Sequence, residues 1–293
     1  TNYMSIKLSA SLILLRPTPS SFQVLMVKRA DNIRLGGFNV FPGGMLDDSD
    51  SSLELMSRFR TQSIFSPFIE GVDSLDMSAL KICALRETYE ETGIMLLDPS
   101  VPAGLTFAEA CTKTTQNIDL QRLQYFHRII TPAIMKERYD TTFFLSEIDP
   151  QVQVKLDPTE CKEYDWVDPL QAINLHMRGE FKLLPPQVLS LYMLAHFADT
   201  QSIQRALSNI SYSVETPEFD PEAKVLCLVG DYRHSRTPPE LKKLRLENYT
   251  VPPSLPGKRP MSINPLVYSC LRASPYKLEL AESQYNRLAK PRL

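Results

Sequence analysis

The sequence predicts an α/β fold in which a mixed sheet is covered by helices on both faces. Two apolar runs, residues 5–15 and 22–29, are separated by a turn that contains two prolines, and such runs are typical of paired strands. Residues 24–27 are all apolar, as in a strand that is buried on both faces. Residues 79–92 carry apolar side chains on two opposite sides, so a helix formed there would be covered twice, as in an α/β/α arrangement.

The composition is that of an ordinary globular protein. Hydrophobic residues make up 43% of the 293 residues and charged residues 23%, which suits one large domain, or one domain with a sizeable extension. The formal net charge is −2, from 32 basic and 34 acidic residues, so we expect no general attraction to nucleic acid. An anionic substrate must therefore be bound by local charge.

Cysteine usage, hydropathy and the last residues bear on the environment of the chain. The five cysteines are scattered without a C-x-x-C pair, so a reducing compartment is the simplest interpretation. The longest early apolar run, residues 8–15, is far shorter than the ~20 residues of a membrane helix, so we expect no membrane span. Arg292 and Leu293 fit the end of a peroxisomal signal while Pro291 does not, and both peroxisome and mitochondrion stay open.

The segment between the first strands and the central helix has two parts. Residues 36–44 contain four glycines and a proline, which predicts a loop in which the backbone approaches another group closely. Residues 47–76 are rich in Ser and Asp, and we interpret them as an insertion that runs over the surface. Ser78 or Asp76 is expected to cap the helix at residues 79–92, and Gly93 to end it.

The second half of the chain continues the alternation of helices and strands. We expect helices at residues 107–123, 169–177 and 186–197, and strands at 126–130, 139–145, 164–167 and 225–229. Beyond residue 210 the chain becomes rich in proline and basic residues, which build little core. This tail is expected to pack on the domain or on a partner, as in a homo-oligomer or a larger complex.

Three carboxylates on the central helix form the strongest chemical signal. Glu87, Glu90 and Glu91 stand at positions i, i+3 and i+4, so they project from one face of the helix and repel one another. A divalent cation relieves this repulsion, and carboxylate oxygens are the ligands that Mg²⁺ prefers. The sequence therefore indicates a metal site.

The alternative is an ordinary solvated charged face. Against it, Leu80, Cys83 and Ala84 precede the glutamates on the same side of the helix and should pack on the sheet. The glutamates continue this apolar stripe. We therefore expect them to point into a cleft at the end of the sheet.

Residues 86–94, Arg-Glu-Thr-Tyr-Glu-Glu-Thr-Gly-Ile, resemble the second half of the Nudix signature, G-x5-E-x7-R-E-U-x-E-E-x-G-U, and Gly44 resembles its first residue. An uninterrupted signature would place the arginine at position 58, which leaves 28 extra residues before Arg86. Ser78 stands where the first glutamate is expected when one counts back from Arg86, and Asp76 is a candidate substitute.

This resemblance implies the α/β/α sandwich of the Nudix hydrolases, here with an insertion inside the signature and a C-terminal extension. It also implies hydrolysis of a diphosphate linkage with Mg²⁺ or Mn²⁺. The implied metal ligands are Gly44, Glu87, Glu90 and Glu91. The implied catalytic residues are Arg86, Glu87, Glu91 and, from the loop before Trp166, Glu160. We expect the hydrolase domain at residues 1–205, the insertion at 47–77 and the extension at 206–293.

The long insertion is similar to that of the coenzyme A diphosphatase subfamily, and further segments between residues 5 and 205 resemble it. A coenzyme A pattern, L-L-T-x-R-[SA]-x3-R-x3-G-x3-F-P-G-G, nearly matches residues 25–44, with one residue fewer before Gly37 and Val27 in place of threonine. The resemblance implies coenzyme A or acyl-coenzyme A as substrate, with phosphopantetheine and adenosine bisphosphate as products. The implied substrate-binding residues are Arg29, Arg34, Gly43, Gly44 and Arg138.

Other interpretations stay open. Each arginine is alternatively a surface cation or a member of an ion pair. Within the family, ADP-ribose, a dinucleotide or an RNA cap is an alternative substrate. Outside enzymes, the chain is alternatively an accessory subunit with a Nudix fold in a larger assembly.

Overall fold

The computed structural model describes most of the first 207 residues and short parts of the remainder. These residues are 6–60, 74–96, 101, 104–114, 118–133, 135–207, 214–220, 222, 225–228, 233–236, 249–251 and 261–263. The prolines that define the expected C-terminal tail, at positions 238, 239, 252, 253, 256 and 260, lie outside the described residues. Among the described residues, no helix has both the length and the hydropathy needed to cross a membrane.

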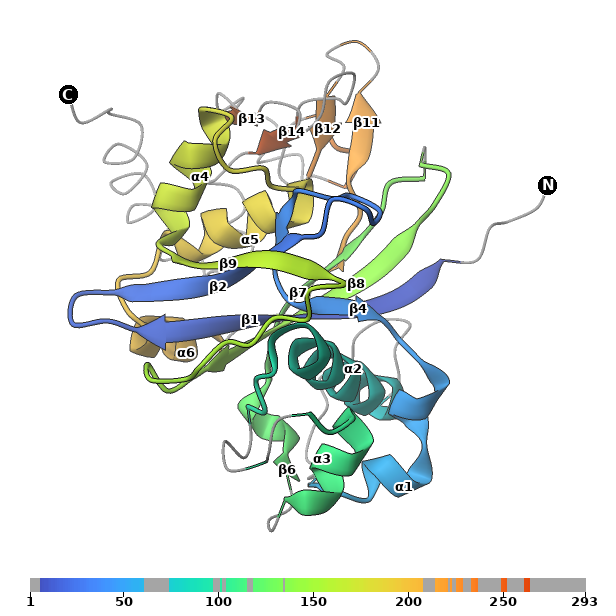
Figure 1. Cartoon of the computed structure of the whole chain (residues 1–293). Helices are drawn as coiled ribbons and strands as arrows, with labels where there is room; N and C mark the ends of the chain where they lie inside the picture. Colours follow the sequence, from blue (N-terminus) through green and yellow to red (C-terminus); the bar gives the residue numbers. More distant parts are fainter. Residues whose placement is uncertain are drawn as a thin grey trace.

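A mixed sheet forms the centre of the molecule (Figure 1). Its described strands run in the order β10-β7-β8-β1-β2-β3, while β4 pairs with β1 and β9 pairs with β2. The β1–β8 and β7–β10 pairs are parallel, and the remaining pairs are antiparallel. The bounds are β1 (Lys7–Pro17), β2 (Phe22–Arg29), β3 (Asn39–Val40), β4 (Gly43–Met45), β7 (Gln124–Ile130), β8 (Tyr139–Glu147), β9 (Cys161–Val167) and β10 (Val214–Glu215).

Helices cover both faces of this sheet, which confirms the predicted layers (Figure 1). The side chains of β1 alternate: Ala10, Leu12 and Leu14 belong to a core shared with α2, while Ile13 and Leu15 belong to a second core. The second core includes buried residues of α4 and α5. The helices are α1 (Leu53–Met56), α2 (Ser74–Thr92), α3 (Phe107–Lys113), α4 (Pro169–Met177), α5 (Pro185–Leu194) and α6 (Thr200–Leu207).

Helix α2 is covered on two sides, as its sequence predicts. Leu80, Cys83 and Ala84 are at most 1% exposed and belong to the core beneath β1. On another side of α2, the ring of Tyr89 lies 6.0 Å from that of Phe107 in α3. Figure 1 shows α1 and α3 on the side of α2 away from the sheet.

The start of α2 differs from the prediction. The helix begins at Ser74, so positions 76 and 78 lie inside it and are not its N-cap position. Residues 74–78 contain neither Gly nor Pro, and the buried Met77 gains core contacts by extending the helix. The end agrees with the prediction: Gly93 has φ 68°, and its N–H donates to the Tyr89 carbonyl at 2.8 Å.

The predicted helix at residues 107–123 is wrong in its second half. Helix α3 ends at Lys113, and the chain then forms strand β6 (Ile118–Asp119) and the 3₁₀ turn η2 (Leu120–Arg122). Thr114 accounts for the end because its hydroxyl donates back to the Cys111 carbonyl, while Asp119 starts the new turn by accepting from the Gln121 N–H.

The remaining short elements flank the main sheet. Beside α1, the insertion contributes the 3₁₀ turn η1 (Asp48–Ser51) and strand β5 (Phe59–Arg60), which pairs with β6. Helix α6 has no counterpart among the predictions. Within residues 206–293, β10 extends the main sheet. A second sheet contains β11 (Glu218–Asp220), β12 (Val225–Cys227), β13 (Tyr249–Val251) and β14 (Met261–Ile263).

Candidate active site

Three carboxylates from distant parts of the chain meet beside β4. One oxygen from each of Glu87, Glu91 and Glu160 lies within 4.8 Å of the others. The first two extend from α2, and Glu160 comes from the loop before β9, held there by the 2.8 Å bond from the Ala30 N–H to its carbonyl. The structure thus brings the loop glutamate suggested by the sequence to the helix glutamates.

The position of Glu91 is costly for a charged group. Its side chain is 1% exposed, and one of its oxygens accepts from the Gly43 N–H at 3.2 Å. Burial, together with the nearby Glu87 charge, raises the pKa of Glu91 to about 8, although Arg29 opposes the shift. Burial also raises the pKa of Glu87. A divalent cation would remove this cost, so the donor set fits a hard metal ion.

Gly44 lies directly against this cluster. A Cβ atom at position 44 would stand 2.4 Å from the carboxyl carbon of Glu87, which no real contact allows. The glycine therefore lets β4 approach the helix closely, as the glycine-rich pattern predicts. Gly44 in turn pairs with Ala10 of β1, so the central sheet fixes its position.

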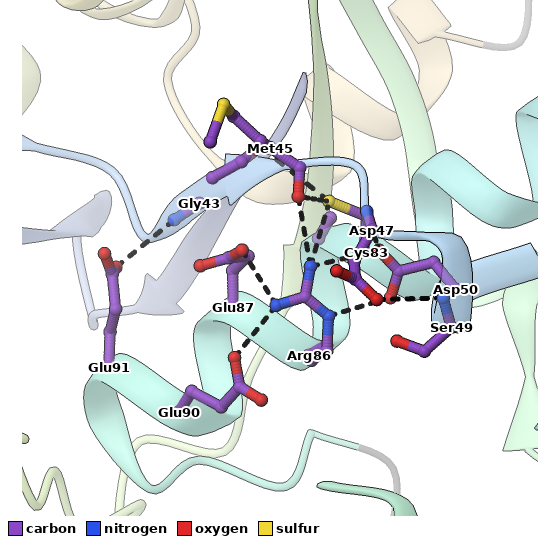
Figure 2. Close-up of polar contacts among 12 residues, drawn as sticks. Gly43, Met45, Asp47, Ser49, Asp50, Cys83, Arg86, Glu87, Glu90 and Glu91 are labelled. Atoms are coloured by element: carbon purple, nitrogen blue, oxygen red, sulfur yellow. Dashed lines mark hydrogen bonds and ion pairs between the residues drawn. The ribbon is translucent and has the colours of Figure 1, made fainter. Parts of the chain in front are cut away.

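Arg86 organises the carboxylates around it (Figure 2). Its Nη1 donates to Glu87 at 2.8 Å and to Glu90 at 2.9 Å. Its Nε and Nη2 donate to the two oxygens of Asp50 at 2.8 and 3.0 Å, and Nη2 also donates to the Met45 carbonyl. Burial alone would lower the pKa of Arg86, but the Asp50 and Glu87 carboxylates raise it, so this side chain stays charged.

Glu90 differs from its two helix neighbours. Its side chain is 46% exposed and accepts from Arg86, and it is not part of the three-carboxylate cluster. It lies next to Glu87 because both accept from the same guanidinium nitrogen (Figure 2). Of the three glutamates on the predicted face, the structure therefore brings two together with Glu160.

The predicted substrate-binding arginines have different surroundings. Arg29 lies near enough to Glu91 for its charge to oppose the raised pKa of that carboxyl, and its Nε donates to the Arg34 carbonyl at 3.1 Å. Arg34 donates to the Tyr139 hydroxyl at 2.5 Å and pairs with Glu137. Arg138 is half-buried and donates to the Thr131 carbonyl at 2.9 Å, which joins the ends of β7 and β8.

Comparisons with known proteins found chains of similar sequence and fold. No protein-family model matches the chain. A crystal structure of a Nudix hydrolase from Alicyclobacillus acidocaldarius is 26% identical, with a TM-score of 0.56, over 72% of this chain and 99% of that one. The putative Nudix hydrolase 7 of Caenorhabditis elegans is 24% identical over 94% of this chain and 91% of its own length. In sequence and in fold, the chain is thus similar to Nudix hydrolases.

Other relatives within the Nudix hydrolases are named acyl-coenzyme A diphosphatase NUDT19. The human protein is 26% identical over 65% of this chain and 65% of its own length, and the Xenopus laevis protein is 25% identical over 66% and 64%. The chain thus spans about two thirds of the length of these relatives. Nudix hydrolases are diphosphate-cleaving enzymes that generally use divalent metals, in keeping with the carboxylate cluster described above.

The first acidic residue of the Nudix signature is present at a position that the backward count from Arg86 missed. Asp50 stands six residues after Gly44, which is the spacing of the signature when it is counted forward. Asp50 is fully buried and holds Arg86 with both oxygens. The expectation that Ser78 replaces this residue is therefore wrong. The extra residues lie between Asp50 and Arg86. The ion pair of these two side chains holds the two parts of the interrupted signature together.

Proposed function

We propose that the chain is a Mg²⁺- or Mn²⁺-dependent diphosphatase that cleaves coenzyme A or acyl-coenzyme A. The products would be a phosphopantetheine, acylated or not, and adenosine bisphosphate. The observation that carries the proposal is the cluster of Glu87, Glu91 and Glu160 beside the cationic Arg29. The acyl-coenzyme A diphosphatase relatives support the substrate. The proposal takes residues 1–205 as the hydrolase domain and 206–293 as its extension.

In this proposal the cluster and its surroundings bind the metal. The ligands are the carboxylates of Glu87, Glu91 and Glu160, with the Gly44 carbonyl from β4. Glu90, which the resemblance to the Nudix signature adds as a ligand, lies next to Glu87 on the same Arg86 nitrogen. A bound divalent cation neutralises charge on the diphosphate oxygens and makes a coordinated water more acidic.

The side chains of the site have separate tasks in the hydrolysis. Arg86 fixes the Glu87 carboxylate, and Asp50 fixes Arg86. Glu160 or Glu87 accepts the proton of the attacking water, because both carboxylates lie at the cluster and neither is fully buried. Arg29 binds a phosphate oxygen beside the cluster, where its charge already acts on Glu91. Arg34, Gly43 and Arg138 complete the proposed substrate contacts.

A substrate panel tests the proposal. The purified chain is incubated with Mg²⁺ or Mn²⁺ and coenzyme A, an acyl-coenzyme A, ADP-ribose or a dinucleoside polyphosphate, and the products are identified by mass. We expect phosphopantetheine and adenosine 3′,5′-bisphosphate from the coenzyme A substrates, and a loss of about 100-fold or more in Glu91→Gln. Glu54→Gln, an exposed glutamate of α1, is the control with unchanged turnover.

Three results would overturn the proposal. Faster hydrolysis of ADP-ribose or of the dinucleotide than of coenzyme A would assign the site to another nucleoside diphosphate. Metal-dependent turnover by Glu91→Gln at the level of the unsubstituted chain would remove the carboxylate cluster from the mechanism. Absence of hydrolysis with every substrate and both metals would favour an accessory role in an assembly.

A further inference from the structure

Tyr139, at the start of β8, is surrounded by cations. The Arg34 guanidinium carbon lies 5.4 Å from the centre of its ring, and the Lys7 ammonium lies 5.8 Å from it. Arg34 also donates to the Tyr139 hydroxyl at 2.5 Å. Tyr139 is only partly buried, so an aromatic ring with two positive charges close to it reaches the surface.

The charges around this ring are incompletely balanced. Arg34 pairs with Glu137, but the two side chains are 55% and 51% exposed, and such exposed pairs contribute little to stability. The ammonium of Lys7 is exposed, and no carboxylate among the described residues forms an ion pair with it. An anion with more than one negative charge can therefore replace Glu137 at low cost and bind both cations.

A chain of contacts connects this ring to the carboxylate cluster. The charge of Arg29 opposes the raised pKa of Glu91. The Nε of the same side chain donates to the Arg34 carbonyl. Along β1, Lys7 pairs with Tyr139 and Ser11 pairs with Gly43. These positions are four residues apart, which corresponds to about 13 Å in a strand. The contacts of Arg29 and this spacing along β1 link the Tyr139 ring to the carboxylate cluster.

We propose that Tyr139, Lys7 and Arg34 form the subsite for the purine base and the ribose phosphate of the substrate. The base stacks on the Tyr139 ring. The ribose phosphate binds the Arg34 fork in place of Glu137, with Lys7 as a second cation. This inference rests on the proposed function, because it requires a substrate that carries a phosphomonoester on its nucleoside.

The experiment compares coenzyme A with dephospho-coenzyme A, which differs only by the ribose phosphate. The measured quantity is the ratio of kcat/KM for the two substrates. We expect the unsubstituted chain to prefer coenzyme A by about tenfold or more, and Lys7→Gln and Arg34→Gln to reduce this ratio towards one. Tyr139→Leu is expected to lower kcat/KM about tenfold for both substrates, because both contain the base.

Matched controls come from exposed residues of the same types. Tyr164→Leu replaces a tyrosine of β9 that is 42% exposed, and Lys113→Gln replaces an exposed lysine at the end of α3. Neither control should change the ratio. Equal effects of Tyr164→Leu and Tyr139→Leu, or an unchanged ratio in both Lys7→Gln and Arg34→Gln, would overturn the inference.

A binding measurement separates this inference from the proposed function. Calorimetry is used to measure the binding of adenosine 3′,5′-bisphosphate and of AMP to the unsubstituted chain and to each variant, without turnover. Tighter binding of the bisphosphate that Lys7→Gln and Arg34→Gln weaken supports the subsite, even if hydrolysis fails. Equal affinities for the two nucleotides, or variants that bind as the unsubstituted chain does, would reject the subsite while leaving a measured hydrolysis intact.

Discussion

At the scale of single residues, the pair formed by Asp50 and Arg86 decides whether the interrupted signature functions as one unit. Asp50 is fully buried, and its two oxygens accept from two nitrogens of Arg86 in a fork. Arg86 then holds Glu87 from the other side of the guanidinium. A single buried carboxylate thus fixes the geometry of Glu87, a proposed metal ligand, through one intervening side chain.

The variant Asp50→Asn tests this arrangement. It keeps the shape of the side chain but removes the charge opposite a partly buried guanidinium that still pairs with Glu87 and Glu90, so we expect a loss of about 2 kcal/mol in stability and a lower kcat. The control is Asp48→Asn, in the same 3₁₀ turn but exposed, which should change neither. Thermal unfolding and steady-state kinetics measure both quantities, and a stable, fully active Asp50→Asn would contradict the arrangement.

The sequence predicted residues of this site unevenly. The helical spacing of Glu87, Glu90 and Glu91 was sufficient to place them on one face, because the helix period is a local property. The forward spacing from Gly44 also pointed to Asp50, yet the count from Arg86 obscured it. The proximity of Glu160 to α2 depends on how the loop before β9 folds back, and no local pattern contains that information.

At the scale of elements, the close contact of β4 with α2 determines where the Glu87 carboxylate of the cluster lies. The variant Gly44→Ala would place a Cβ atom 2.4 Å from the Glu87 carboxyl carbon, so either the strand or the carboxylate must move. We expect turnover and metal affinity to fall by roughly 10- to 100-fold. Met45→Ala, on the same strand with a side chain that is 51% exposed, should retain both.

Metal titration followed by activity distinguishes these outcomes. If Gly44→Ala has the same turnover and the same metal affinity as the unsubstituted chain, the close contact between β4 and α2 is not required. A similar loss in Met45→Ala would indicate a general disturbance of the strand.

The prediction of helices and strands succeeded where the apolar pattern was long. It failed where a few local side-chain contacts determine where a helix begins or ends. The layers around β1 and α2 followed from apolar periodicity alone. The end of α3 did not, since the hydroxyl of Thr114 and the side chain of Asp119 redirect the chain within a few residues. The start of α2 was also missed, because burial of Met77 outweighs the capping preference of Ser78.

At the scale of the whole molecule, Glu91 links stability to pH in the metal-free protein. Its folded pKa, about 8, is raised above the ordinary glutamate value near 4.5. A raised folded pKa favours the folded state at low pH, and this contribution is lost as pH rises from about 4.5 to about 8. The Glu91 contribution should therefore fall by up to roughly 1.4 kcal/mol per pH unit across this window.

Unfolding in chelator at several pH values between 5 and 8 measures this effect. The difference in stability between the unsubstituted chain and Glu91→Gln isolates the carboxyl, because glutamine cannot ionise. We expect the glutamine variant to become the more stable of the two as pH rises. Parallel pH profiles of the two proteins would show that Glu91 does not titrate in this range.

Strand β10 affects which backbone edges of the sheet are open to pairing with other protein chains. It comes from the segment after α6 and pairs with β7, the strand at one end of the order formed by residues 1–205. The backbone groups of β7 that β10 occupies would otherwise form an open hydrogen-bonding edge, and such edges recruit foreign strands and lead to aggregation. Strand β10 thus covers this part of the sheet edge, and we expect it to limit pairing with foreign strands there.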